Sequence, residues 1–263
     1  MATITYRDGI AILQLIVFPF VFITSLFIWK RTGWRVGAKI WRYAATLSLI
    51  RIAGSISSLL TISHDSRDVE VAVAVCELIG LAPLLLTYIG ILRQIDMDQK
   101  MHPRFLNLLA LACFIGLILG IAGVSSAGDN EGGYQPGIIV KASMGIFIAV
   151  FVITMVLAVW LFIQLSFSMR VFQRRLFLAV VLCSPLLLIR IIYSAISDYA
   201  HNSRFAVLSG DPTVYLCMSV LEEIVAMGVT MALGVAAVRA EDFVQVVAAG
   251  EGKPEVAYQP CSV

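Results

Sequence analysis

The chain has 263 residues, of which 60% are hydrophobic and only 14% are charged, and its net charge is +2. Its mean hydropathy of +0.92 is too high for a soluble domain and, together with repeated long apolar runs, indicates a membrane protein. The small net charge gives no reason to expect a nucleic-acid partner, so the partner that the composition indicates is the lipid bilayer.

Seven apolar runs reach the length of about twenty residues that crosses the hydrocarbon core of a bilayer. We therefore predict an all-α, polytopic protein with a seven-helix transmembrane domain over residues 1–240 and a flexible tail over residues 241–263. In chain order, the predicted spans are Gly9–Trp29, Trp41–Ile62, Val71–Leu92, Phe105–Ser125, Ile138–Phe162, Leu176–Ser197 and Val214–Val238.

Basic residues are divided unevenly between the two sides of these spans. Because Lys and Arg in short loops favour the cytoplasm, we predict an outside or lumenal amino terminus and a cytoplasmic carboxyl tail. The endoplasmic reticulum and the plasma membrane both fit this orientation. The basic-rich side carries Lys30, Arg31, Arg35, Lys39, Arg42, Arg93, Lys100, Arg104, Arg170, Arg174, Arg175, Arg239 and Lys253, and the other side carries Arg7, Arg67, Lys141 and Arg204.

Two stretches of the chain repeat each other. The motif Leu-Ile-Arg-Ile at 49–52 returns at 188–191, and in each copy two serines follow the arginine at i+4 and i+7. These spacings place the arginine and both serines on one helical face. The serines are Ser55 and Ser58 in the first copy and Ser194 and Ser197 in the second.

A carboxylate follows each copy in the next predicted span, Glu77 after the first and Glu222 after the second, with matching flanking residues. Spans two and three are therefore echoed by spans six and seven, in the same membrane direction. We predict two parallel three-helix repeats joined by the fourth span, a 3+1+3 arrangement of the kind found in some transporters.

Charges inside these spans form the candidate site. An unpaired charge there costs at least about 2.5 kcal/mol and marks a functional site by default. The repeat suggests that Arg51 pairs with Glu77 and Arg190 with Glu222, which leaves Glu223 over. Two readings stay open: buried ion pairs that fix helix register, or a surplus carboxylate that serves as a general acid or proton site.

Three tyrosines extend the candidate site. Tyr88 shares a helical face with Glu77, and Tyr215 shares one with Glu222, although aromatic residues at such spacings also fit core packing. The third, Tyr193, follows Arg190 in the sixth span. We expect no cofactor and no metal, because no Cys or His lies at ligand spacing.

Three motifs carry a family resemblance: Gly80-Leu81-Ala82-Pro83-Leu84-Leu85-Leu86 with Gly90 and Arg93, Leu187-Leu188-Ile189-Arg190 with Tyr193, and Glu222-Glu223. Together they resemble an uncharacterised seven-helix membrane protein family of filamentous fungi, over nearly the whole chain to about Arg239. The size and the buried acids are also similar to those of fungal membrane-bound terpene cyclases, a likeness of size and logic only.

Three functions remain open. The surplus acid favours an intramembrane acid-catalysed enzyme of fungal secondary metabolism, of the terpene or meroterpenoid cyclase or isomerase type, acting on a lipophilic substrate. The alternatives are a receptor-like protein and a small-molecule carrier, neither of them catalytic. In the enzyme, the catalytic candidates are Glu222, Glu223 and Glu77, and the substrate-binding candidates are Arg51, Arg190, Tyr88, Tyr193 and Tyr215.

Overall fold

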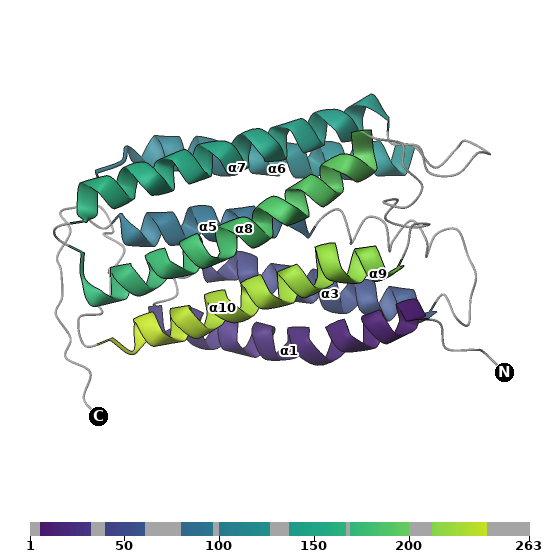
Figure 1. The fold of residues 1–263 in the computed structure, drawn as a ribbon, viewed down its shortest axis with the longest axis horizontal. Helices are drawn as coiled ribbons and strands as arrows, with labels where there is room; N and C mark the ends of the chain where they lie inside the picture. The colour runs from purple at the N-terminus through teal and green to yellow at the C-terminus, as the bar shows by residue number, and fades with distance from the viewer. Residues whose placement is uncertain are drawn as a thin grey trace.

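The computed structural model describes residues 6–32, 40–60, 80–96, 100–126, 137–166, 169–199 and 212–240. These residues form a bundle of helices that run nearly side by side along its long axis (Figure 1). In chain order, the helices are α1 (Tyr6–Thr32), α3 (Trp41–Leu60), α5 (Leu81–Ile95), α6 (Pro103–Ser126), α7 (Ile138–Leu165), α8 (Val171–Tyr199), α9 (Pro212–Tyr215), the π-helical turn η3 (Leu216–Val220) and α10 (Leu221–Val238).

The predicted all-α membrane fold is confirmed in its coarse form. Six helical stretches are long and apolar enough to cross a membrane, and each coincides with a predicted span. The exception is α5, a shorter apolar helix of 15 residues where Val71–Leu92 was predicted. Residues 71–79 of that predicted span, and the predicted tail 241–263, lie outside the described residues.

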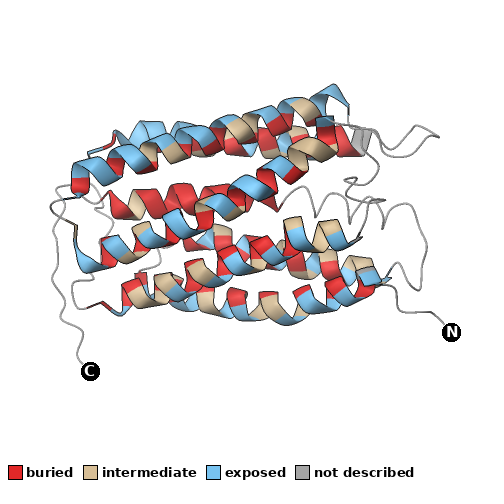
Figure 2. Ribbon diagram, viewed as in Figure 1, coloured by how far each residue is buried: buried red, intermediate tan, exposed pale blue. Residues whose placement is uncertain are grey.

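The helix α5 occupies the centre of the bundle. It packs against α3, α6, α7 and α8, while α1 packs against α3 and α10, and α8 packs against α7 and α10. Every residue from Leu81 to Leu92 is buried, which Figure 2 shows as an almost continuous red ribbon. The other long helices each bury one side. They are arranged around α5, and α1 packs against α10, so the first and the last long helix are neighbours.

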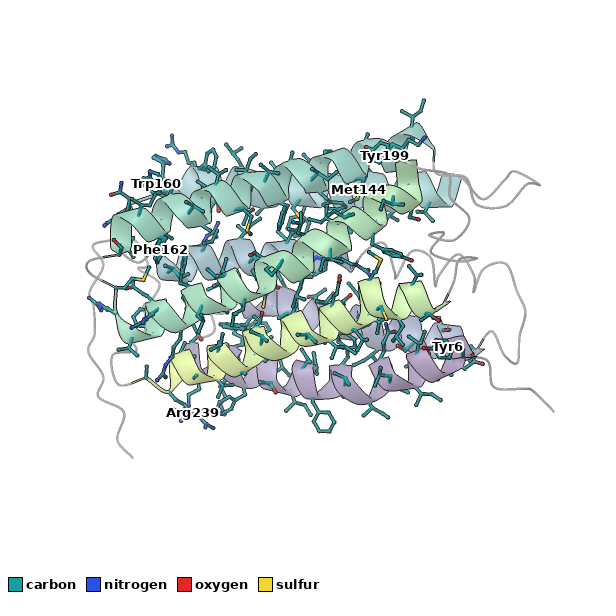
Figure 3. The ribbon with its side chains drawn as sticks, viewed as in Figure 1. Tyr6, Met144, Trp160, Phe162, Tyr199 and Arg239 are labelled. Carbon is teal, nitrogen blue, oxygen red and sulfur yellow. The ribbon has the colours of Figure 1, made fainter. Side chains whose placement is uncertain are left out.

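The outer surfaces of these helices are apolar and exposed, as expected for helices that face lipid. Phe20, Ile118 and Val156 are examples, each more than half exposed. Exposed tyrosine and tryptophan side chains lie towards both ends of the bundle, with Tyr6 and Tyr199 at one end and Trp160 towards the other (Figure 3). Aromatic belts of this kind lie at the two membrane interfaces.

Close packing between α6 and α7 depends on the glycines of α6. A Cβ added at Gly120 would lie 3.0 Å from Oγ of Ser143, and the Ser143 hydroxyl donates a 2.7 Å hydrogen bond to the carbonyl of Gly116. These small residues therefore bring two helices of one chain together, the internal use of a Gly-x-x-x-Gly spacing.

Candidate functional site

Glu223 is the centre of a buried charge cluster that joins three helices. The Nε atom of Arg51 on α3 donates to its Oε1 at 2.7 Å, and Nη2 of the same arginine pairs with its Oε2. Arg190 on α8 approaches from the other side, with Nη2 4.0 Å from Oε2. The side chains of Arg51 and Glu223 are each 2% exposed and that of Arg190 is 6% exposed. The cluster thus ties α3 and α8 to the first turn of α10.

The two arginines hold Glu223 differently. Arg51 uses two nitrogens against both carboxylate oxygens, the fork geometry that makes arginine–carboxylate pairs strong and directional. Arg190 makes a longer contact with one oxygen. Two basic side chains therefore share one buried carboxyl group, and Arg51 makes the closer contact.

The prediction that Glu223 has no arginine partner is wrong. This glutamate was expected to be left over after Arg51 paired with Glu77 and Arg190 with Glu222, but it is the acid that both arginines contact. Glu77 lies outside the described residues. The adjacent Glu222 is buried, no described residue forms a hydrogen bond with its Oε2, and Arg190 acts on it electrostatically, so Glu222 is the more weakly held of the two acids.

Arg51 sits in a tightly packed environment. A Cβ added at Gly80 would lie only 2.6 Å from its Nη2, so a side chain at that position has no room. One turn further along α3, the hydroxyl of Ser55 lies 3.0 Å from Oε1 of Gln14 on α1 and 2.8 Å from the carbonyl of Arg51. Residues of α1 and of the start of α5 therefore pack against the first copy of the repeat and leave no space beside it.

The predicted tyrosines lie at different places. Tyr88 is buried on α5, and its hydroxyl lies 3.4 Å from Oγ1 of Thr230 on α10. Cys183 on α8 approaches the same threonine at 3.7 Å. Tyr193 is buried on α8, three residues beyond Arg190, and Tyr215 is half-buried at the end of α9.

Thr230 and Cys183 were missed from the sequence, although a signal exists. Thr230 follows Glu223 by seven residues, and Cys183 precedes Arg190 by seven, so each shares a helical face with its charged partner. With Tyr88 they form a second, uncharged polar contact between α5, α8 and α10, about 10 Å along the axis from the charge cluster at ~1.5 Å per residue.

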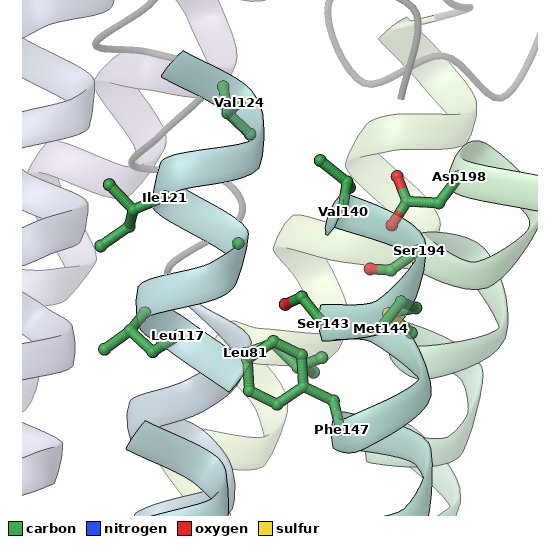
Figure 4. Close-up of a pocket in the computed structure, with 11 residues that line it drawn as sticks. Leu81, Leu117, Ile121, Val124, Val140, Ser143, Met144, Phe147, Ser194 and Asp198 are labelled. Carbon is green, nitrogen blue, oxygen red and sulfur yellow. The ribbon is translucent and has the colours of Figure 1, made fainter. Parts of the chain in front are cut away.

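A pocket of about 450 Å³, including the space at its mouth, lies between α5, α6, α7 and α8. It is at the end of the bundle where α1 and α7 begin and α6 and α8 end, which we call the N-terminal end (Figure 1). Its walls are apolar apart from three polar side chains, Ser143, Ser194 and Asp198, whose oxygens face the space between the helices (Figure 4).

Asp198 is the candidate residue that sequence reasoning overlooked. It is 3% exposed, and no hydrogen bond or ion pair joins it to another residue in the described part of the chain. The ammonium of Lys141 on α7 is close enough to interact with it electrostatically. Its signal was present in the sequence, because Arg190, Ser194 and Asp198 follow one another at i, i+4 and i+8 on one face of α8.

No group of three His, Cys, Asp or Glu side chains within the described ranges is placed to hold a metal ion. The functional groups present in the charge cluster around Glu223 and in the pocket are buried carboxyl groups, arginines and hydroxyl groups.

Comparison with known proteins gives a family. No curated protein and no solved structure matches the chain. The family model of a domain of unknown function, DUF7702, matches residues 4–240, which include every described helix. The extent of this match agrees with the resemblance drawn from the sequence, which ended near Arg239. The chain therefore belongs to the DUF7702 family.

Proposed function

We propose that the protein binds a small lipophilic molecule between its helices and responds to it as a receptor does, without transforming it. The observation that carries this proposal is the pocket at the N-terminal end, which combines apolar walls with a buried carboxylate. Its lining is mostly apolar with a few converging polar groups, the composition that is typical of small-molecule sites.

The response would pass through α8. Ser194 lines the pocket, and Arg190 lies one turn before it on the same face, where it contacts Glu223 of α10. A ligand that draws α8 towards α6 and α7 changes the 4.0 Å contact between Arg190 and Glu223. A bound molecule shifts such an equilibrium only by its difference in affinity for the two arrangements, and the pocket supplies contacts that depend on the position of α8.

The proposal includes the membrane topology. We propose seven spans in a parallel 3+1+3 repeat, with α5 as the third span, the amino terminus outside or lumenal and the carboxyl tail in the cytoplasm. Supporting this, α1 packs on α3 as α7 packs on α8, and α3 on α5 as α8 on α10. The pocket then faces the outer side. Cysteine labelling at Asn130 and at Gln99 in intact cells should report opposite sides of the membrane.

A pair of neighbouring variants tests ligand binding. Leu117→Trp places a bulky ring in the pocket, whereas Ile118→Trp places the same ring on the lipid-facing side of α6, where Ile118 is 64% exposed. We expect native mass spectrometry to find a small molecule bound to the parent protein and to Ile118→Trp, and to find it lost from Leu117→Trp. If all three proteins carry only bulk lipid, the proposal is wrong.

A second function is favoured by a separate observation. The buried Oε2 of Glu222 has no hydrogen-bond partner among the described residues, which leaves it available to a substrate as an intramembrane general acid. In that case the protein is an enzyme of the terpene or meroterpenoid cyclase or isomerase type, with Glu222 as the acid. Glu223 is less suited to this role, because both of its carboxyl oxygens are engaged by Arg51, and Arg190 lies 4.0 Å from one of them.

Product analysis separates the two functions. Membranes that contain the protein should leave an isoprenoid substrate unchanged if the protein is receptor-like. Turnover that is lost in Glu222→Gln and retained in Asp198→Asn would establish the enzyme instead. Uptake of an unchanged molecule into proteoliposomes would favour a carrier, the remaining alternative.

A further inference from the structure

We propose that the pocket at the N-terminal end selects a lipophilic amine, whose protonated nitrogen pairs with Asp198. This inference rests on the proposed ligand-binding function and names the chemical class of the ligand. It starts from the position of Asp198, which is 3% exposed, lines the pocket and has no hydrogen bond or ion pair with the other described residues. A carboxylate in such surroundings is costly unless a cation or several donors reach it.

The neighbouring hydroxyl groups add acceptors. The proton of Ser143 is already used, because its Oγ donates to the carbonyl of Gly116 at 2.7 Å. Its remaining capacity towards the pocket is that of an acceptor. Ser194 forms no hydrogen bond with any described residue and can accept or donate as the ligand requires. A primary or secondary ammonium has two or three N–H donors to match this arrangement, whereas a carboxylate ligand has none.

The remaining lining residues accommodate the apolar part of the ligand. Helix α6 contributes Leu117, Ile121 and Val124, and α7 contributes Met144 and Phe147. Polarizable and aromatic side chains of the last two kinds also interact favourably with cations. The pocket therefore offers one negative charge, spare acceptors and apolar walls, the complement of a single ammonium group on a hydrocarbon body.

Among the described residues, Lys141 on α7 is the charged group that acts on Asp198. It does not line the pocket, and no ion pair joins it to Asp198 among the described residues. Lys141 therefore competes with the ligand through its charge without filling the ligand's place. Removing this charge should strengthen the binding of an amine, an effect opposite to that of removing Asp198.

Binding of matched ten-carbon probes to the purified full-length protein in nanodiscs of uncharged phospholipid tests this inference. Decylamine, decan-1-ol and decanoic acid differ only in the head group. We expect decylamine to bind in a saturable manner and roughly tenfold or more tightly than decan-1-ol, because hydrogen bonds to charged groups are the stronger ones. Decanoic acid should bind most weakly of the three.

Three variants assign the preference to its residues. Asp198→Asn should bring the affinity for decylamine down to that for decan-1-ol. Asp8→Asn, a change of another buried aspartate at the N-terminal end of the bundle, should leave the preference intact. Lys141→Gln should raise the affinity for decylamine several-fold, so the inference remains testable even if Asp198→Asn does not fold.

Other results overturn the inference in distinguishable ways. Equal binding of decylamine and decan-1-ol to the parent protein contradicts selection of an amine but leaves a ligand pocket in place. An amine preference that persists in Asp198→Asn, or that does not rise in Lys141→Gln, removes Asp198 from the recognition. If none of the probes binds in a saturable manner and Leu117→Trp carries the same bound molecules as the parent protein, the ligand-binding function fails as well.

Discussion

The two copies of the repeated motif have almost the same sequence but different surroundings. In the first copy, Arg51 grips both oxygens of Glu223, and Ser55 is hydrogen-bonded to Gln14 of α1. In the second, Arg190 reaches one oxygen of the same acid at 4.0 Å, and Ser194 borders a pocket. Neighbouring helices pack closely against the first copy of the motif, whereas the second copy has a pocket on one side.

This difference shows that the neighbouring helices, and not the motif, decide what an intramembrane arginine does. Helix α1 and Gly80 pack closely around the first copy. Helices α6 and α7 stand apart from the second copy at the N-terminal end and leave the pocket. The first copy is therefore packed on all described sides, and the second borders the pocket that we propose as the binding site.

The largest difference in stability should come from removing each of the two arginines in turn. Arg51→Ala leaves the buried Glu223 without its two-nitrogen partner, and we expect a loss of about 3–5 kcal/mol in stability. Arg190→Ala removes the longer contact and should cost less than half as much. Thermal unfolding of both variants in detergent measures this. Equal losses would mean that the two copies of the motif contribute equally to stability, and would contradict the difference between them.

The adjacent glutamates should also differ. Glu223→Gln leaves two buried arginines without the charge that they share, so we expect a loss of about 3 kcal/mol. Glu222→Gln changes a carboxylate whose Oε2 has no hydrogen-bond partner among the described residues, and should cost less than about 1 kcal/mol or stabilise the protein. The same unfolding measurement compares the two, and a larger loss for Glu222→Gln would reverse the assignment of the more weakly held acid.

A smaller effect should follow from filling the space beside Arg51. Gly80→Val forces the guanidinium away from Glu223, because even a Cβ would lie 2.6 Å from Nη2, and overpacking of this kind costs about 1–3 kcal/mol. Gly228→Val is the matched control, since a Cβ at Gly228 meets no atom within 4 Å. The control should change the unfolding temperature little. A similar decrease in both variants would show that valine itself, and not the position, is responsible.

The smallest effect concerns the repeated serines. Ser55→Ala removes the contact with Gln14 inside a closed environment and should cost about 1 kcal/mol. Ser194→Ala should change stability by no more than a few tenths of a kcal/mol, because no hydrogen bond joins Ser194 to a described residue. Unfolding temperatures of the two alanine variants give the comparison. An equal cost would argue that the pocket side of α8 is as tightly packed as α3.

The fold was predictable from the sequence where it depends on the length and apolarity of single helices. The predicted spans Trp41–Ile62 and Ile138–Phe162 begin at the same residues as α3 and α7 and end within three residues of them. The central position of α5 was not predicted, because a helix buried by protein on every side and a helix facing lipid are equally apolar. Hydropathy alone does not distinguish these two surroundings.

The site was only partly predictable. The cost of intramembrane charge singled out Arg51, Arg190 and Glu223 as candidates, but the sequence did not predict that these three lie together. The choice between Glu222 and Glu223 failed, because adjacent residues point about 100° apart and the repeat did not show which of the two faces α3. Asp198 was not predicted because it lies near the end of a span, where a carboxylate is common and does not by itself indicate a functional site.

The contact between Arg51 and Glu223 also has a consequence for how the protein is made. The two residues are 172 positions apart, and the arginine belongs to α3 whereas the glutamate belongs to α10. At synthesis rates of about 5–20 residues per second, α3 is complete roughly 10–35 s before Glu223 leaves the ribosome. The Glu223 carboxyl group is thus absent while α3 is inserted. The contact between α3 and α10 is therefore among the last to form in the bundle.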